Sequence, residues 1–262
     1  MSKDYEKILY SLEDGVARIS MNDPATRNAA SAQMGGELLD AFDRAASESR
    51  AVLFTGEGKG FSAGANLADA STLLANTRRD VGDLLDIYFN PIITRMKAME
   101  QPIVTAMRGG AAGVGCSLAM AGDIIVCGEG GFFLQAFRHI GLVPDGGSSW
   151  LLSRAVGRVR AMEMMLLGER IYGAQALDWG LVTRVVPDDD VESTGLALAT
   201  ELAKGPRSLG LIKRIAWAAA DLSLEQTLAL ERVVQLEAGR TEDFVEGVSA
   251  FVGKRPVQFK GR

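Results

Sequence analysis

The chain has 262 residues, of which 47% are hydrophobic and 23% charged, so it has the composition of a soluble globular protein rather than a disordered or fibrous one. Its 28 lysines and arginines against 33 aspartates and glutamates give a net charge of −5, which argues against nucleic acid or an anionic membrane as a partner and favours a small-molecule ligand. The single histidine, His139, excludes a multi-histidine metal site and makes a histidine-dependent hydrolase a weak hypothesis.

The amino-terminal part of the chain predicts a β-hairpin followed by a helix. Two β-type runs, Ile8 to Leu12 and Val16 to Met21, flank Asp14-Gly15, which supplies the positive φ that a tight hairpin needs. Ser31 can cap a helix that reaches about Ala46, because apolar residues recur at helical spacing along one stripe. The residues of this stripe are Met34, Leu38, Leu39 and Phe42.

Strands and helices then alternate up to about residue 140, which is the pattern of an α/β architecture. Buried strands are predicted at Ala51 to Thr55, Pro102 to Met107 and Ile124 to Cys127, with a helix ending at Met99. Beyond Gly146 the sequence predicts helices only. They cover 148–168, 191–203, 208–220 and 224–239. Pro187 and the acidic run 188–190 form the clearest boundary, so we expect a core over 1–190 and a helical region over 191–262.

The sequence favours a cytoplasmic location. Residues 1–7 are charged and lack the apolar stretch of a signal peptide. The two cysteines, Cys116 and Cys127, are neither a close pair nor a disulfide framework, which fits a reducing compartment. The richest apolar region is interrupted by Arg108 and Asp123, and the run between them is shorter than the roughly 20 residues of a membrane helix. No membrane partner is expected.

Two glycine-rich loops, 56–66 and 109–116, each follow a predicted buried strand. Small side chains let a ligand approach the backbone, and amides at such turns can donate to a negatively charged oxygen. The pair could therefore form an oxyanion hole, although tight turns and close helix packing would explain either loop alone. Neither loop has the spacing of a dinucleotide fingerprint or of a phosphate-binding loop.

Several ordered motifs resemble those of the enoyl-CoA hydratase/isomerase, or crotonase, superfamily. The first loop carries Phe61-Ser62-Ala63-Gly64-Ala65-Asn66, with Asn66 where the family usually has aspartate, and the second resembles the family's glycine-rich loop and following helix. Further similar segments extend over nearly the whole chain: 22–29, 141–147, 154–157, 161–168, 180–182 and 251–260. The resemblance implies an α/β fold, a crotonase-like spiral of ββα units, with a helical C-terminal trimerisation region that makes homotrimers or dimers of trimers.

The resemblance also implies an acyl-CoA thioester as the ligand, with no separate cofactor and no metal. The thioester oxygen would lie between the backbone amides of Ala65 and Val114, which would stabilise an enolate. Val114 departs from the glycine common in hydratases, and its side chain narrows the space. Other positions similar to substrate-contacting ones are Ala63, Asn66, Leu67, Gly113 and, near the CoA phosphates, Arg27, Phe259 and Lys260.

The two glutamates with which hydratases of this family activate water are replaced here. Matching the motifs places Ser117 and Phe137 at those positions, so ordinary two-glutamate hydration is not expected. Ser117 could orient a water or an acyl group, or simply pack its helix. His139 is expected to be structural or exposed. Asp69, Asp80, Asp83 and Asp86 could line a pocket but are better explained as a solvated face.

Asp145 is the candidate acid/base. It resembles the carboxylate of single-acid isomerases in the superfamily, and one carboxylate can remove a proton from one carbon and return it to another. From residue chemistry alone, Asp145 would instead cap the helix that begins near Gly146. We expect an acyl-CoA isomerase. The alternatives are a hydratase or thioester hydrolase that uses another carboxylate, and a non-catalytic CoA-ester binding protein.

Overall fold

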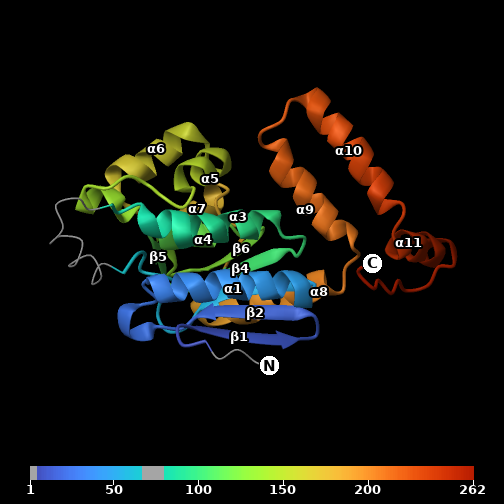
Figure 1. Cartoon of the computed structure of the whole chain (residues 1–262), viewed down its shortest axis with the longest axis horizontal. Helices are drawn as coiled ribbons and strands as arrows, with labels where there is room; N and C mark the ends of the chain where they lie inside the picture. Colours follow the sequence, from blue (N-terminus) through green and yellow to red (C-terminus); the bar gives the residue numbers. More distant parts are fainter. Residues whose placement is uncertain (1–4, 67–79) are drawn as a thin grey trace.

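The computed structural model describes residues 5–66 and 80–262. Its larger sheet has six strands in the order β1-β2-β3-β4-β6-β9, in which β1 and β2 pair antiparallel and the other neighbours pair parallel (Figure 1). The strands are β1 (Ile8–Glu13), β2 (Val16–Met21), β3 (Ala51–Gly56), β4 (Ile103–Met107), β6 (Ile124–Gly128) and β9 (Arg184–Val186).

The predicted hairpin is confirmed. Glu13 pairs with Val16, and the two residues between them, Asp14 and Gly15, have φ of 49° and 78°. Positive φ at both central positions matches the twist of the flanking strands, which is why Asp-Gly stands at this turn.

Both faces of the larger sheet are covered by helices, so its central strands are buried on both sides. Val52 and Phe54 of β3 contribute to the larger cluster of buried side chains, with α1 (Ala32–Glu48), α3 (Asn90–Ala98) and α4 (Val114–Met120). Leu53 points the other way, into a second cluster with α8 (Val191–Ala203). The predicted cap of α1 is present, because the Ser31 side chain accepts a hydrogen bond from the Met34 amide at 3.2 Å.

A second, three-stranded sheet was not predicted. It consists of β5 (Gly110–Ala112), β7 (Phe132–Leu134) and β8 (Arg170–Tyr172), with β5 parallel to β7 and β7 antiparallel to β8. The chain passes from the larger sheet to the smaller one twice, from β4 to β5 and from β6 to β7. A helix, α4, follows β5, so a ββα unit is completed there and the expected spiral fold is present. Gly109, with φ of 63°, makes the first passage.

The prediction that the chain becomes helical beyond Gly146 is wrong at two places, because the strands β8 and β9 lie there; the short helix α7 (Gly173–Asp178) between them was not predicted. The helix predicted over 148–168 is two helices, α5 (Ser148–Ala155) and α6 (Gly157–Leu167), since Gly157 has a φ of 78° that no continuous helix contains. Shorter helical turns complete the core: η1 (Pro24–Thr26), the π-helix η2 (Leu85–Phe89), η3 (Ala136–Ile140) and η4 (Asp188–Asp190).

The C-terminal helices α9 (Ser208–Ala219), α10 (Leu224–Ala238) and α11 (Glu242–Val252) extend to one side of the sheets (Figure 1). By contrast, α8 packs on the larger sheet through Val191, Ala199 and Ala203. An ion pair anchors α9, with the Nζ atom of the buried Lys213 2.9 Å from a carboxylate oxygen of the half-buried Asp123. Within residues 5–66 and 80–262, no helix has the length and apolar character needed to cross a membrane.

Candidate active site

The two glycine-rich loops lie side by side and are joined through their backbones. The Ser62 amide donates to the Gly110 carbonyl at 3.1 Å, and the Ala112 amide donates to the Ser62 carbonyl at 2.9 Å. Two residues after Ser62, a Cβ placed on Gly64 would lie 2.8 Å from the Ala112 carbonyl oxygen, so only glycine fits between the loops there. The sequence therefore positions the ends of the two loops next to each other through backbone contacts alone.

The backbone amides of Ala65 and Val114 come shortly after the two joined segments in the sequence. Val114 is the first residue of α4, and an amide in a first helical turn has no acceptor within its helix. Ala65 forms a parallel bridge with Ala30, whose amide donates to the Gly64 carbonyl and whose carbonyl accepts from the Asn66 amide. In such a bridge the N–H of the middle residue points away from its partner. In the described part of the chain, neither amide has an acceptor.

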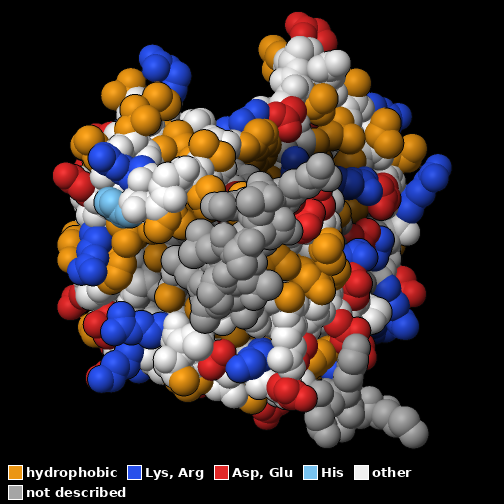
Figure 2. All heavy atoms as spheres, turned by 60° about the vertical axis from the view of Figure 1, so that its left-hand side comes forward, with side chains coloured by type: hydrophobic (Ala, Val, Ile, Leu, Met, Phe, Trp, Pro, Cys, Tyr) orange, Lys and Arg blue, Asp and Glu red, His pale blue; other side chains and the backbone are white. Residues whose placement is uncertain are grey.

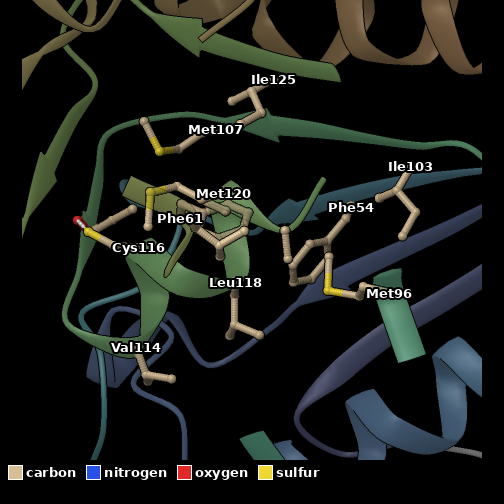
Figure 3. Close-up of a cluster of buried hydrophobic side chains, with 14 of the residues drawn as sticks. Phe54, Phe61, Met96, Ile103, Met107, Val114, Cys116, Leu118, Met120 and Ile125 are labelled. Atoms are coloured by element: carbon tan, nitrogen blue, oxygen red, sulfur yellow. Dashed lines mark hydrogen bonds between the residues drawn. The ribbon is translucent and has the colours of Figure 1, made fainter. Parts of the chain in front are cut away.

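α4 is held in the core by apolar contacts. Figure 3 shows Val114, Cys116, Leu118 and Met120 of this helix among buried side chains that include Phe61 from the first loop. The Cys116 thiol donates to the Ala111 carbonyl at 2.8 Å. Burial raises the pKa of this thiol to about 12, so it is a packing group rather than a nucleophile.

Asp145 lies beside the second loop, at the start of a tight turn. The Ser148 amide donates to the Asp145 carbonyl at 3.0 Å, and a Cβ placed on Gly146 would lie 3.3 Å from Val114 Cγ2. The capping interpretation of Asp145 is wrong, because Gly147 is the N-cap of α5 and no side chain caps that helix.

The carboxyl group of Asp145 has unusual surroundings. Its Oδ1 atom is buried and has no hydrogen-bond partner among the described residues. Burial alone raises the pKa of this carboxyl from its ordinary value to about 6. A carboxylate with this pKa can take up and release a proton near neutral pH, which is what an acid/base group must do.

The two positions similar to hydratase glutamates carry no acid here and have different roles. Ser117 is fully buried and its hydroxyl donates to the Asp145 carbonyl at 2.9 Å, so its hydroxyl hydrogen is used within the protein. Phe137 is 6% exposed, and its Cζ would lie 3.8 Å from a Cβ placed on Gly113. Its ring forms an apolar wall at the loop that leads to Val114.

Arg27 and Ala63 flank the first loop. Both are exposed, and the Arg27 carbonyl accepts a hydrogen bond from the Ala63 amide at 2.9 Å. Asn66 follows Ala65 on the same stretch, whereas Leu67 and Asp69 lie outside the described residues.

Phe259 and Lys260 do not approach the paired loops within the chain. The Lys260 amide donates to an Asp243 carboxylate oxygen of α11 at 2.6 Å, and Figure 1 shows α11 at the opposite end of the molecule from β5. Any role for these two residues in CoA binding would therefore require another copy of the chain.

The remaining candidates are at the surface. His139 is exposed and its Nε2 atom lies 2.9 Å from the Gly168 carbonyl oxygen, which confirms its non-catalytic placement; it is the pale blue side chain in Figure 2. Asp80, Asp83 and Asp86 are exposed, as expected of a solvated face. The described residues contain no group of three or more side chains that could hold a metal ion.

Two polar residues of this region were not singled out from the sequence. Gln135 and Ser148 are both fully buried, and Ser148 Oγ lies 2.6 Å from Ser117 Oγ. Their only sequence signal was position, since Gln135 lies two residues before Phe137 and Ser148 follows the glycines after Asp145.

Comparisons with known proteins agree with this geometry. A sequence profile described as Enoyl-CoA hydratase/isomerase matches residues 11–262. The chain is 38% identical over 260 residues to 1,2-epoxyphenylacetyl-CoA isomerase of Escherichia coli, covering 98% of this chain and 99% of the relative. It is 32% identical to 2,3-dehydroadipyl-CoA hydratase of the same organism, with 98% and 99% covered. A crystal structure of an enoyl-CoA hydratase from Polaromonas superposes with a TM-score of 0.90 at 31% identity, covering 97% of this chain and 99% of that one.

Proposed function

Since the chain belongs to the enoyl-CoA hydratase/isomerase family, we propose that it is an acyl-CoA isomerase that moves a double bond, or opens or rearranges an epoxide ring, through an enolate. One observation carries this proposal. Asp145, whose carboxylate has one buried oxygen without a hydrogen-bond partner among the described residues, lies beside the paired loops, while Ser117 and Phe137 occupy the positions similar to hydratase glutamates. The 1,2-epoxyphenylacetyl-CoA isomerase relative is consistent with an isomerase.

In the proposed mechanism the Ala65 and Val114 amides receive the thioester oxygen. Asp145, in its ionised form, removes a proton from a carbon next to or conjugated with the thioester carbonyl. The electron pair moves onto that oxygen, where two donors stabilise the negative charge. The protonated Asp145 then returns the proton to a different carbon, so the double bond moves and the atoms of the substrate are conserved. This chemistry requires no metal and no redox cofactor.

Hydration would require an activated water, and the residues near Asp145 disfavour it. Phe137 contributes an apolar ring, and the Ser117 hydroxyl hydrogen is committed to the Asp145 carbonyl. A hydratase or thioester hydrolase that uses another carboxylate is the second candidate, because 2,3-dehydroadipyl-CoA hydratase is also a relative. A non-catalytic CoA-ester binding protein is the third.

We further propose that the enzyme acts in the cytoplasm as a homotrimer or a dimer of trimers. The C-terminal helices expose many large apolar side chains, which is unusual for a monomer and typical of a subunit interface. On α10 and α11 these are Leu224, Leu228, Val233, Leu236, Phe244, Val245, Val248, Phe251 and Val252. Assembly could also bring Phe259 and Lys260 of one copy to the loops of another.

The test compares wild type, Asp145→Asn and Glu163→Gln on linear 3-enoyl-CoA, 2-enoyl-CoA and aryl-CoA esters, followed by mass and by diene absorbance. Glu163 lies on the exposed face of α6, so its variant is a matched charge control. We expect isomerisation by wild type and the control and loss of it in Asp145→Asn. Full activity of Asp145→Asn would remove this residue from the mechanism. Incorporation of oxygen from labelled water would instead identify a hydratase or hydrolase, and ligand binding without turnover a binding protein.

A further inference from the structure

We propose that three buried side chains, Gln135, Ser148 and Ser117, form a directed chain of hydrogen bonds that positions Asp145 by holding its backbone carbonyl. Ser117 and Ser148 are then positioning residues, since they act through Asp145 rather than on a substrate. This inference rests on the proposed function for its catalytic consequence, but its structural content can be tested without turnover.

The order of donors in this chain follows from the chemistry of its members. The Ser117 hydroxyl lies 2.9 Å from the Asp145 carbonyl oxygen, which can only accept, so the single hydroxyl hydrogen of Ser117 is used there. The 2.6 Å contact between the two serine hydroxyls must therefore be donated by Ser148. Ser148 in turn accepts from Gln135 Nε2 at 3.5 Å. Each hydroxyl donates once and accepts once, and the chain runs from Gln135 to Asp145.

Burial makes this chain a specific structural device rather than a surface contact. Gln135, Ser148 and Ser117 are each 0% exposed, so water does not compete for their hydrogen bonds. They come from three separate parts of the fold, namely the residue after β7, the first residue of α5 and the middle of α4. Burying these polar groups leaves one atom unsatisfied, because Gln135 Oε1 has no hydrogen-bond partner among the described residues.

The turn that carries Asp145 packs closely against Ser117. Gly146 and Gly147 have φ of 53° and 78°, and the Ser148 amide closes the turn on the Asp145 carbonyl at 3.0 Å. With the Ser117 hydroxyl, this carbonyl accepts two hydrogen bonds, its full capacity. A Cβ on Gly146 would lie 2.9 Å from Ser117 Cβ, so there is no space for the turn to shift toward α4.

This arrangement fixes where the carboxylate lies without lowering its basicity. A hydrogen bond donated to a carboxylate stabilises the charged form and lowers its pKa. Here the donors hold the backbone carbonyl of Asp145, while its buried Oδ1 atom receives none from the described residues. The side chain is thus placed by its own main chain and remains available to a substrate.

The experiment compares wild type with Ser117→Ala, Ser148→Ala, the double variant and Ser49→Ala. Ser49 is the matched control, because its buried hydroxyl also donates to a backbone carbonyl, that of Ala45 at 2.7 Å, at the far end of α1. Two readouts are measured: kcat and KM on the best substrate of the acyl-CoA panel, and the titration midpoint of the Asp145 carboxyl by carbon-13 NMR of aspartate-labelled protein, assigned with Asp145→Asn.

We expect Ser117→Ala to lower kcat by about 10- to 100-fold with little change in KM, because a displaced base loses the aligned geometry of proton transfer. Its Asp145 midpoint should fall toward the ordinary value of about 3.9 as the loosened turn admits water. The kcat of the double variant should fall no further than that of Ser117→Ala alone, since the effects of substitutions within one series of hydrogen bonds are not additive. Ser49→Ala should match wild type in both readouts.

A kcat within about twofold of wild type in Ser117→Ala, together with an unchanged Asp145 midpoint, would overturn the positioning role. The proposal would also be overturned if the fold losses in kcat of the two single variants multiplied in the double variant, because the two serines would then act independently. If Ser117→Ala does not fold, Ser148→Ala carries the same test one step earlier, with a smaller loss expected. If wild type shows no isomerisation, the proposed function fails, and the NMR midpoints alone decide whether the chain positions Asp145.

Discussion

Replacing Asp145 by asparagine should stabilise the protein at neutral pH while it abolishes isomerisation. Burial raises the pKa of the Asp145 carboxyl to about 6 in the folded chain, whereas an unfolded aspartate has a pKa of about 3.9. The folded state therefore holds the Asp145 proton up to higher pH, and the wild type loses stability as the pH rises from about 4 to about 6. Above pH 6 the whole penalty is present.

The size of this penalty follows from the pKa difference. A shift of about 2 units corresponds to about 3 kcal/mol, and partial exposure of the side chain, through solvent screening, reduces this to about 1–2 kcal/mol. Urea unfolding of wild type, Asp145→Asn and the charge control Glu163→Gln at pH 7.5 and pH 5 measures it. The advantage of the asparagine variant should be largest at pH 7.5 and shrink at pH 5. An asparagine variant no more stable than wild type at pH 7.5, or an advantage independent of pH, would refute the burial argument.

Three further predictions concern the base, the donors and the anchor of α9. The value of kcat/KM should rise with pH through about 6 and level off above it, because Asp145 must be ionised in the substrate-free enzyme to act as a base. A profile that is flat from pH 5 to 8 would contradict this. Gly64→Ala should lower kcat/KM by about 10²–10³-fold, since its Cβ would meet the Ala112 carbonyl oxygen and displace the Ala65 amide; activity within fivefold of wild type would separate that amide from the reaction. Lys213→Met should reduce the free energy of unfolding by about 1.5–3 kcal/mol, because it removes the charged partner of the half-buried Asp123 carboxylate, and a urea titration showing less than about 1 kcal/mol would count against this.

The elements with strong local signals could be predicted from the sequence. The hairpin at Asp14-Gly15, the cap at Ser31 and the helix over 191–203 depend on turn chemistry, capping and periodicity, which act over a few residues. The small sheet could not be predicted in this way, because β5, β7 and β8 are three residues each and are stabilised by partners far away in the chain. Periodicity also carried the predicted helix over 148–168 across Gly157, where the backbone turns.

The candidate site likewise contains features with a local sequence signal and features that depend on distant contacts. The glycine-rich loops are visible in the residues themselves, whereas Asp145 was singled out by its resemblance to the carboxylate of single-acid isomerases. The roles of Ser117, Ser148 and Gln135 could not be predicted, because a buried serine bonded to a distant carbonyl has the same local sequence as a serine that packs a helix. Likewise, capping by Asp145 was a sound local expectation that the two left-handed glycines after it exclude.

The backbone joint at Ser62 has a consequence for how this scaffold can change. Because Ser62 both donates to and accepts from the 110–112 segment, the segments that lead to the Ala65 and Val114 amides are joined through the backbone. Asp145 lies on a separate turn, and the Ser117 hydroxyl donates a hydrogen bond to its backbone carbonyl. If the two amides bind the thioester oxygen as proposed, the acid could be relocated or exchanged without changing that contact.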